Sequence, residues 1–78
     1  MEKRSGILKV LQAVAENNLT PQDDESLFTS GLLDSFVLTD FVVGLEKEFS
    51  VTIPDADMTA RKFDTIHKVD EYLTAKGV

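Results

Sequence analysis

The chain has 78 residues, no cysteine and one histidine, so neither a disulfide framework nor a cysteine- or histidine-rich metal site is expected. Its 14 acidic residues outnumber the 8 basic ones and give a net charge of −6, which disfavours nucleic acids and anionic membranes as partners. The acidity favours basic patches on other proteins, unless it serves only solubility, and the 42% of hydrophobic residues suffices for one small helical domain covering residues 1–78.

The first predicted helix begins at Ser5, whose hydroxyl suits an N-terminal cap, and ends near Asn17 and Asn18. Its apolar residues recur three and four positions apart and form one face. They are Ile7, Leu8, Leu11, Val14 and Ala15. Polar residues interrupt this segment, unlike a signal peptide, and no stretch approaches membrane-spanning length. We expect a cytoplasmic monomer without membrane insertion.

Residues 19–34 are predicted to form a long connection. It opens with an acidic cluster of Asp23, Asp24 and Glu25, which is interpreted as solvated because its spacing does not match a calcium-binding loop. A loop of this length in a small domain needs anchoring. Four apolar residues are expected to pin it across the helices: Leu27, Phe28, Leu32 and Leu33.

The second predicted helix covers residues 35–49 and has two distinct faces. Its buried stripe is expected to contain Leu38, Phe41, Val42, Leu45 and Phe49. The opposite ridge contains Phe36, Asp40, Val43 and Lys47, bordered by Thr39 and Glu46. Apolar residues rimmed by charge indicate a docking surface, unless the long loop or a short third helix covers the ridge. Val37 projects to the side of the helix, and a docking role and coverage by another segment are equally expected for it.

The C-terminal part is predicted to contain one short and one longer helix. Val51 and Ile53 resemble a short strand, but no partner strand is evident. A short helical turn is expected to start within residues 57–59. Thr65 is a suitable cap for a last helix with Ile66, Val69, Tyr72 and Leu73 inward, and Gly77 ends it. The predicted fold is therefore all-α, a four-helix bundle of three main helices and one short helix with a long first loop.

Asp34 and Ser35 lie at the start of the second predicted helix, where three roles are open to them. Catalysis by Ser35 is disfavoured because His67, the only histidine, is expected to face solvent and no nucleophile-elbow motif surrounds the serine. Both residues suit a helix cap. The free N–H groups and positive dipole of a helix start also suit a phosphate carried by the serine. Asp55 and Asp57 are interpreted as turn and cap residues, so no catalytic or metal-binding residue is expected.

Three segments in the same order resemble the acyl carrier protein superfamily, whose members carry phosphopantetheine. GLLDSF at residues 31–36 resembles the attachment signature of that superfamily. LEKEFSVTIPD at residues 45–55 is similar to the end of its second helix, and FDTIHKVDEYL at residues 63–73 to its last helix. The resemblance covers nearly the whole chain and implies an acyl-carrier-like four-helix bundle.

The resemblance implies that a phosphopantetheinyl transferase attaches 4′-phosphopantetheine from coenzyme A to Ser35, and that Asp34 assists near the magnesium of that enzyme. The thiol of the arm would hold an acyl or aminoacyl group as a thioester and shuttle it from a loading enzyme to downstream transferases or synthases. The protein would thus not be an enzyme. Its partner-docking residues would be Phe36, Val37, Asp40, Val43, Glu46 and Lys47.

Some residues depart from the pattern of fatty-acid carriers. Val37 stands where those carriers often have an acid, and Lys47 interrupts the acidic run of the second helix. The segment DADMTARKFD is similar to carriers of specialised or aminoacyl pathways. These features favour a freestanding carrier of a dedicated pathway over the fatty-acid carrier, with acyl and aminoacyl cargo both open. The alternative is an unmodified helical adaptor that uses the same docking surface.

Overall fold

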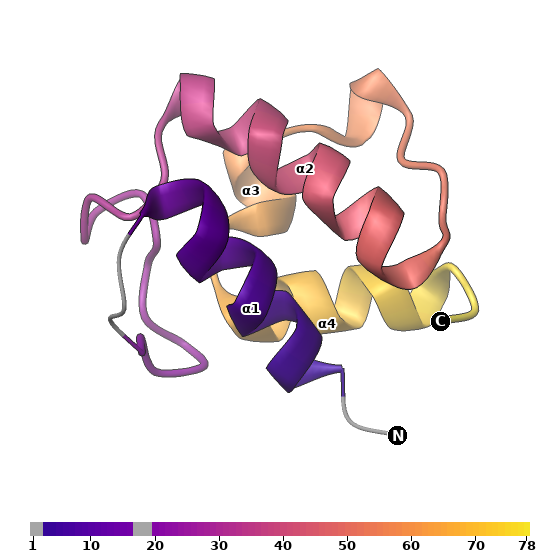
Figure 1. Ribbon diagram of the computed structural model, residues 1–78, viewed down its shortest axis with the longest axis horizontal. Helices are drawn as coiled ribbons and strands as arrows, with labels where there is room; N and C mark the ends of the chain where they lie inside the picture. The colour runs from indigo at the N-terminus through magenta and orange to yellow at the C-terminus, as the bar shows by residue number, and fades with distance from the viewer. Residues whose placement is uncertain (1–2, 17–19) are drawn as a thin grey trace.

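The computed structural model describes residues 3–16 and 20–78, and within these the fold is entirely helical. The elements in chain order are α1 (Arg4–Ala15), α2 (Ser35–Phe49), the 3-10 turn η1 (Asp55–Asp57), α3 (Ala60–Phe63) and α4 (Ile66–Ala75) (Figure 1). No strand forms in the described residues, and none of the helices found there is long and apolar enough to cross a membrane. The predicted all-α fold with three main helices is confirmed.

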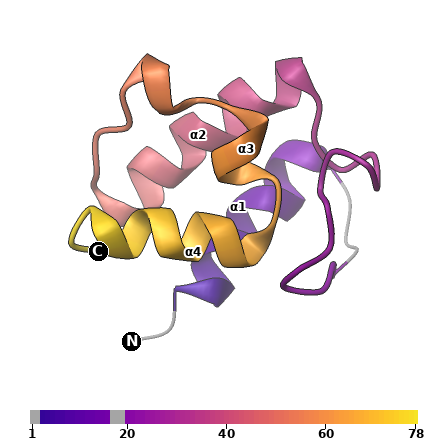
Figure 2. The same ribbon diagram turned by 180° about the vertical axis from the view of Figure 1, so that it is seen from behind.

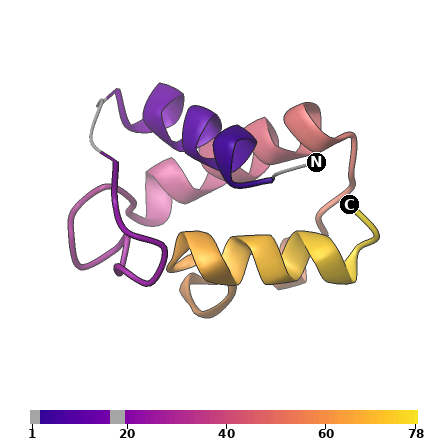
Figure 3. The same cartoon turned by 90° about the horizontal axis from the view of Figure 1, so that it is seen from below.

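The helices surround one core. α1 packs mainly on α2 and also on α4, while the short α3 packs on α4. Seen from behind, α3 and α4 form the near face and α1 the far one (Figure 2). Seen from below, the long loop before α2 closes one end of the bundle (Figure 3). This arrangement leaves the start of α2 at the upper edge of the molecule (Figure 1).

The start of α1 differs from the prediction. Lys3 is the residue before the helix, and its side chain makes no capping hydrogen bond. Ser5 lies inside the first turn with its side chain exposed, so its predicted role as a cap is wrong. The helix ends at Ala15 and is followed by Glu16 in the left-handed conformation, with a φ of 51°. The predicted end at residues 17–18 lies outside the described residues.

The buried face of α1 is only partly the predicted one. Ile7 and Leu11 are buried as expected, and Val10 is buried although the sequence pattern did not select it. The remaining predicted members are half-buried and pack against the core: Leu8, Val14 and Ala15. Val10 is buried because it lies against the surface of α2 at a residue without a side chain.

That residue is Gly44, where α1 crosses α2. A β-carbon added to Gly44 would lie 2.5 Å from Cγ1 of Val10, well inside van der Waals contact. At the other end of the crossing, a β-carbon added to Gly6 would lie 2.8 Å from Cζ of Phe49. The two glycines therefore permit the close approach of the two helices.

We expect Gly44→Ala to destabilise the protein. Alanine favours a helix over glycine by about 1 kcal/mol, but forcing an extra methyl group against Val10 costs about 1–3 kcal/mol. In a Val10→Ala background the obstructing side chain is absent, so the same substitution should be stabilising. Urea unfolding of the four proteins measures both effects, and an equal loss of stability in the two backgrounds would show that the contact does not limit the crossing.

The core is continuous across all the elements except η1. Its buried apolar residues are Ile7, Val10, Leu11, Leu27, Leu32, Leu33, Leu38, Phe41, Val42, Leu45, Ile53, Phe63, Ile66, Val69 and Leu73. The predicted stripe of α2 is buried except for Phe49, which is half-buried. At the centre, the rings of Phe41 and Phe63 meet edge to face with centroids 6.5 Å apart. Phe63 is the buried residue of α3 and joins this short helix to the core.

The long loop is anchored by apolar side chains, as predicted. Leu27, Leu32 and Leu33 are buried and Phe28 is half-buried. Polar groups add to this anchoring at Asp64, the residue after α3. Its carbonyl accepts a hydrogen bond from the N–H of Leu27 at 2.6 Å, and its carboxylate accepts one from the N–H of Phe28 at 3.3 Å. The loop is therefore attached to the junction of α3 and α4 by both apolar and polar contacts.

The acidic cluster of the loop is exposed, as expected, but it is not merely solvated. The carboxylate of Asp23 pairs with the guanidinium of Arg4. The carbonyl of Asp23 accepts a hydrogen bond from the backbone N–H of His67 at 2.9 Å. One member of the cluster therefore joins the long loop to the starts of α1 and α4.

In the C-terminal part, α4 agrees with the prediction and the short helical segment before it does not. The hydroxyl oxygen of Thr65 accepts a hydrogen bond from the N–H of Lys68 at 3.0 Å, which confirms it as the cap of α4. Gly77 follows the helix with a φ of 89°. The one predicted helical turn is in fact two, because η1 precedes Thr59 and α3 follows it. The strand-like residues 51–53 form no strand.

Asp57 and Tyr72 join η1 to α4. The Tyr72 hydroxyl donates a hydrogen bond to Oδ2 of Asp57 at 2.6 Å. Lys62 lies 3.7 Å from the other oxygen of that carboxylate, and both Lys62 and Lys76 lie over the tyrosine ring. The hydrogen bond from Tyr72, together with the two lysine charges, lowers the pKa of the Asp57 carboxyl. Asp57 is therefore more than the turn and cap residue that the sequence predicted.

The single tyrosine should titrate later in the native protein than in the unfolded chain. Burial, followed by the hydrogen bond to Asp57, raises the pKa of Tyr72 to about 12 from its ordinary 10.0. The unfolded chain therefore releases this proton first, and the stabilisation that Tyr72 contributes below pH 10.0 is lost as the pH rises toward about 12. Tyrosinate absorbance of the native and the urea-unfolded protein checks this prediction, and equal midpoints would refute it.

Candidate attachment site at the start of the second helix

Asp34 forms the N-terminal cap of α2. Its backbone is extended, with a φ of −143° and a ψ of −176°. Its side-chain oxygen Oδ1 accepts hydrogen bonds from the N–H groups of Phe36 at 2.9 Å and Val37 at 2.8 Å. Its carbonyl accepts the first helical hydrogen bond, from the N–H of Leu38 at 2.8 Å. The interpretation of Asp34 as a cap is therefore correct, and the helix start is rigidly defined.

Ser35 is the first residue of α2, and its side chain is exposed. Its position is determined from both sides. Before it, Leu32 and Leu33 are buried in the core, and Gly31 makes the preceding turn with a φ of 87°, which favours glycine. After it, the helix is capped by Asp34. The hydroxyl is thus presented to solvent from a backbone that is anchored on either side.

The electrostatic setting of Ser35 differs in part from the expectation. The predicted free N–H groups are fewer, because Asp34 already binds those of Phe36 and Val37. The positive end of the helix dipole remains beside the serine and favours an anionic substituent such as a phosphodiester. An exposed oxygen on an ordered first turn fits covalent attachment of a phosphate-linked arm better than binding of a free phosphate by backbone groups.

The residues considered for serine catalysis are not brought together. His67 lies on α4, is exposed, and faces Glu71 with its Nε2 3.6 Å from a carboxylate oxygen. This pairing turns it toward a neighbour on its own helix. Among the described residues, no group of three or more His, Cys, Asp or Glu side chains is arranged to hold a metal ion.

The outward ridge of α2 is exposed along its length. The side chain of Phe36 is 85% exposed and that of Val43 is 43% exposed, while Asp40, Lys47 and the bordering Thr39 are also exposed. Neither the long loop nor α3 covers Phe36, so that alternative is wrong. An uncovered phenylalanine immediately after the exposed serine is unfavourable in water and suits contact with another protein.

Val37 and Glu46 lie differently from the rest of the predicted docking residues. Val37 is half-buried and packs against the core. Glu46 is half-buried, and its Oε2 accepts a hydrogen bond from the N–H of Ile53 at 2.8 Å. The carboxylate thus holds the segment that follows α2. No spacing rule predicts this bond, because it joins a helix to irregular backbone seven residues later.

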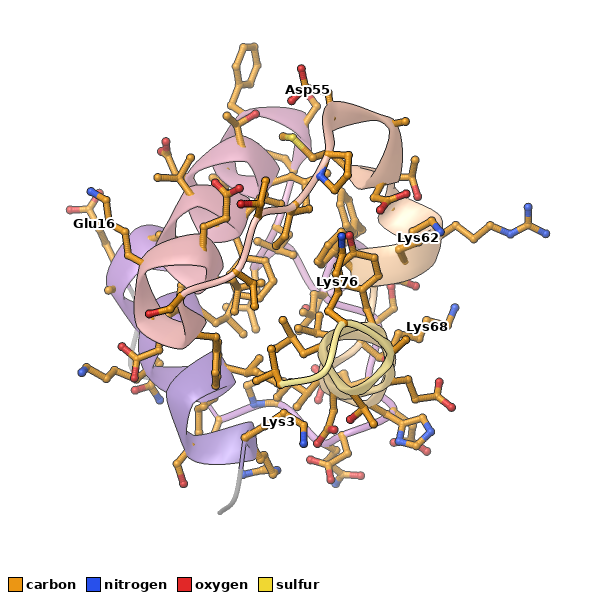
Figure 4. The ribbon with its side chains drawn as sticks, turned by 90° about the vertical axis from the view of Figure 1, so that its right-hand side faces the viewer. Lys3, Glu16, Asp55, Lys62, Lys68 and Lys76 are labelled. Atoms are coloured by element: carbon orange, nitrogen blue, oxygen red, sulfur yellow. The ribbon has the colours of Figure 1, made fainter. Side chains whose placement is uncertain are left out.

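η1 lies at the same upper edge of the molecule as the first turn of α2 but at the other end of that edge (Figures 1 and 2), and the labelled Asp55 marks η1 in Figure 4. Asp55 and Ala56 are exposed.

Comparison with known proteins identifies similarities over nearly the whole chain. The family described as "phosphopantetheine attachment site" matches residues 5–73, which include the capped serine. The D-alanyl carrier protein of Streptococcus mutans is 30% identical over 95% of this chain and 94% of its own. That of Lactobacillus acidophilus is 28% identical over 88% of this chain and 87% of its own.

Proposed function

The chain belongs to the phosphopantetheine attachment family, and from this premise we propose that it carries an aminoacyl group as a thioester on a 4′-phosphopantetheine arm attached to Ser35. Members of this family are carriers rather than enzymes, and the arm is a covalently bound prosthetic group. The observation that carries the choice of residue is the exposed serine on the capped first turn of α2.

The residues around Ser35 fit an attached arm. The exposed hydroxyl is open to a transferase, and the capped helix start keeps it at a constant position. When attached, the arm supplies the thiol that this cysteine-free chain lacks. The helix dipole stabilises the negative phosphodiester at the point of attachment.

Asp34 has two roles in this proposal, and they can be separated. As a cap it orders the first turn, and as a charged group it assists the transferase near its magnesium. Asparagine caps helices about as well as aspartate but carries no charge. Asp34→Asn should therefore keep the unfolding temperature while slowing attachment, whereas Asp34→Ala should lower both. Attachment at the wild-type rate in Asp34→Asn would remove the second role.

Support for an aminoacyl cargo comes from the relatives, which are named as D-alanyl carriers. The segment DADMTARKFD supports it less than expected, because its distinctive residues have structural tasks. Asp57 binds Tyr72, Phe63 fills the core, and Asp64 holds the long loop. D-alanine is accordingly the first cargo to test.

The partners proposed are a phosphopantetheinyl transferase, an aminoacyl-loading ligase and a downstream acceptor enzyme. We assign their docking to the exposed ridge of α2, with Phe36 and Val43 as apolar contacts and Asp40 and Lys47 as charged ones. Glu46 contributes indirectly, by holding the segment after α2 in place. Val37 contributes its exposed edge.

A two-step assay tests the proposal. The apo-protein is incubated with coenzyme A, magnesium and a broad-specificity transferase, and its intact mass is measured. The product is then offered D-alanine and ATP with the ligase that loads a D-alanyl carrier. We expect one phosphopantetheine in the first step and one alanyl group, removable by hydroxylamine, in the second. No gain in the first step rejects the carrier role, and absence of an alanyl group after the second step rejects D-alanine as the cargo.

A second candidate is the unmodified adaptor, which the exposed Phe36 favours because docking through it needs no arm. Intact mass of the protein from its native source separates the two candidates. An unmodified chain in cells that contain an active cognate transferase would support the adaptor.

A further inference from the structure

A shallow cleft of about 450 Å³ lies on the face formed by α3 and α4, away from the helix that carries Ser35. It is lined by Arg61, Lys62, Lys68, Glu71 and Tyr72. The lining contains three cations and one acid, and one of the cations, Lys62, is paired with Asp57, so a small positive excess remains in a chain whose net charge is −6. Lys62 and Lys68 point to the same side of the molecule, opposite to the side of Glu16 (Figure 4).

Two of these cations are available for a ligand. Arg61 and Lys68 are exposed and have no ion-pair partner among the residues that the structure describes. In contrast, each of the three cations at Lys3, Arg4 and Lys9 lies within 4 Å of an acidic side chain of this chain. The positive charges of α1 are thus balanced internally, as is that of Lys62 by Asp57, whereas those of Arg61 and Lys68 are not.

The wall of the cleft is ordered in advance. Tyr72 is held by its hydrogen bond to Asp57, and Lys62 is held by the same carboxylate and by the tyrosine ring, 5.9 Å from its centroid. A binding surface whose side chains are already fixed loses less conformational entropy when a ligand arrives. The unpaired charges of Arg61 and Lys68 therefore flank a rigid aromatic surface.

We propose that this cleft binds a short acidic segment of a partner protein, whose carboxylates pair with Arg61 and Lys68 while its backbone or an apolar side chain lies on Tyr72. The size of the cleft suits a few side chains rather than a globular surface. An anionic membrane fits less well, because a chain of net charge −6 is repelled by an extended negative surface and offers it only two unpaired cations here.

This surface is separate from the proposed docking ridge of α2. A partner that holds the cleft leaves Phe36 and Ser35 accessible, so the carrier can be tethered by one protein while another acts on its arm. Tethering raises the effective concentration of the arm at its enzymes without a change in the affinity of the ridge. The inference does not depend on modification of Ser35, because none of the cleft residues lies on α2.

The test uses the holo-protein and a short fluorescein-labelled glutamate-rich peptide, with a serine-glycine peptide of equal length as a control. We expect saturable binding at low salt, with backbone amide shifts in NMR spectra confined to residues of α3 and the first turns of α4. Arg61→Ala and Lys68→Ala should each weaken binding about fivefold, as expected for loss of one exposed ion pair. Both residues are exposed, so thermal unfolding should not change.

The matched control is Lys9→Ala, which changes the net charge equally but removes a cation of α1 that is paired with Glu48. It should leave peptide binding unchanged. An equal loss in Lys9→Ala, or shifts spread over the whole surface, would overturn the proposal in favour of unspecific charge attraction.

Other partners give other outcomes. Stronger binding to phosphatidylglycerol vesicles than to the peptide, lost in Arg61→Ala and Lys68→Ala, would overturn the proposal in favour of a membrane. Self-association lost in these variants would overturn it in favour of a second copy. Ser35→Ala should bind the peptide normally, so failure of the cleft proposal can be distinguished from failure of the carrier role.

Discussion

Replacement of Ser35 by alanine should abolish the gain of one 4′-phosphopantetheine and leave the fold intact. The hydroxyl is exposed, and the capping of α2 depends on Asp34, so its removal breaks no described hydrogen bond. Alanine is also the best helix former, so the first turn does not weaken. Intact mass after incubation with coenzyme A, magnesium and a transferase measures the first effect, and thermal unfolding by circular dichroism measures the second.

Ser5 provides the matched control for this experiment. It too is an exposed serine in the first turn of a helix, but it is not preceded by a capping aspartate or by anchored leucines. Ser5→Ala should keep the full mass gain. If Ser35→Ala still acquires the group, the attachment residue has been assigned wrongly. Loss of the group together with loss of helicity would instead show that Ser35 has a structural role.

Replacement of Phe41 by alanine should remove a large part of the stability of this small domain, whereas the same change at Phe36 should remove almost none. Phe41 is fully buried and meets Phe63 edge to face. Truncation of a buried phenylalanine costs about 3–5 kcal/mol. Phe36 is 85% exposed, so its truncation should change stability by less than about 0.5 kcal/mol. Urea unfolding of both variants measures the difference.

The order should be reversed for docking to the transferase, where the substitution of Phe36 should have the larger effect. Phe36→Ala should raise the KM of the transferase for the carrier, because an exposed apolar contact beside Ser35 is lost. If Phe41→Ala does not fold, Phe41→Leu retains much of the apolar volume and should show a smaller loss of stability with an unchanged KM. Equal destabilisation by Phe36→Ala and Phe41→Ala would mean that the faces of α2 are assigned wrongly.

Short-range rules predicted a helix correctly where its capping residues and its periodicity lie within the helix itself. The limits of α2 and the cap of α4 follow from short-range hydrogen-bonding rules and helical periodicity, and the structure has both as predicted. The same rules failed at Ser5, because a suitable capping residue does not determine which turn the helix begins with. They also passed over Val10, whose burial depends on the partner helix rather than on its own.

The sequence by itself therefore determined the all-α class, the capped start of α2, the exposed Ser35 and Phe36, and the leucines that anchor the loop. These features follow from periodicity and from residues within a few positions of one another. Only the tertiary structure decided the contacts that join distant segments: Gly44 against Val10, Asp57 with Tyr72, and the unpaired charges of Arg61 and Lys68 beside the Tyr72 ring. Such contacts depend on how helices cross, and the crossing is set by packing across the whole core, which no single segment of sequence specifies.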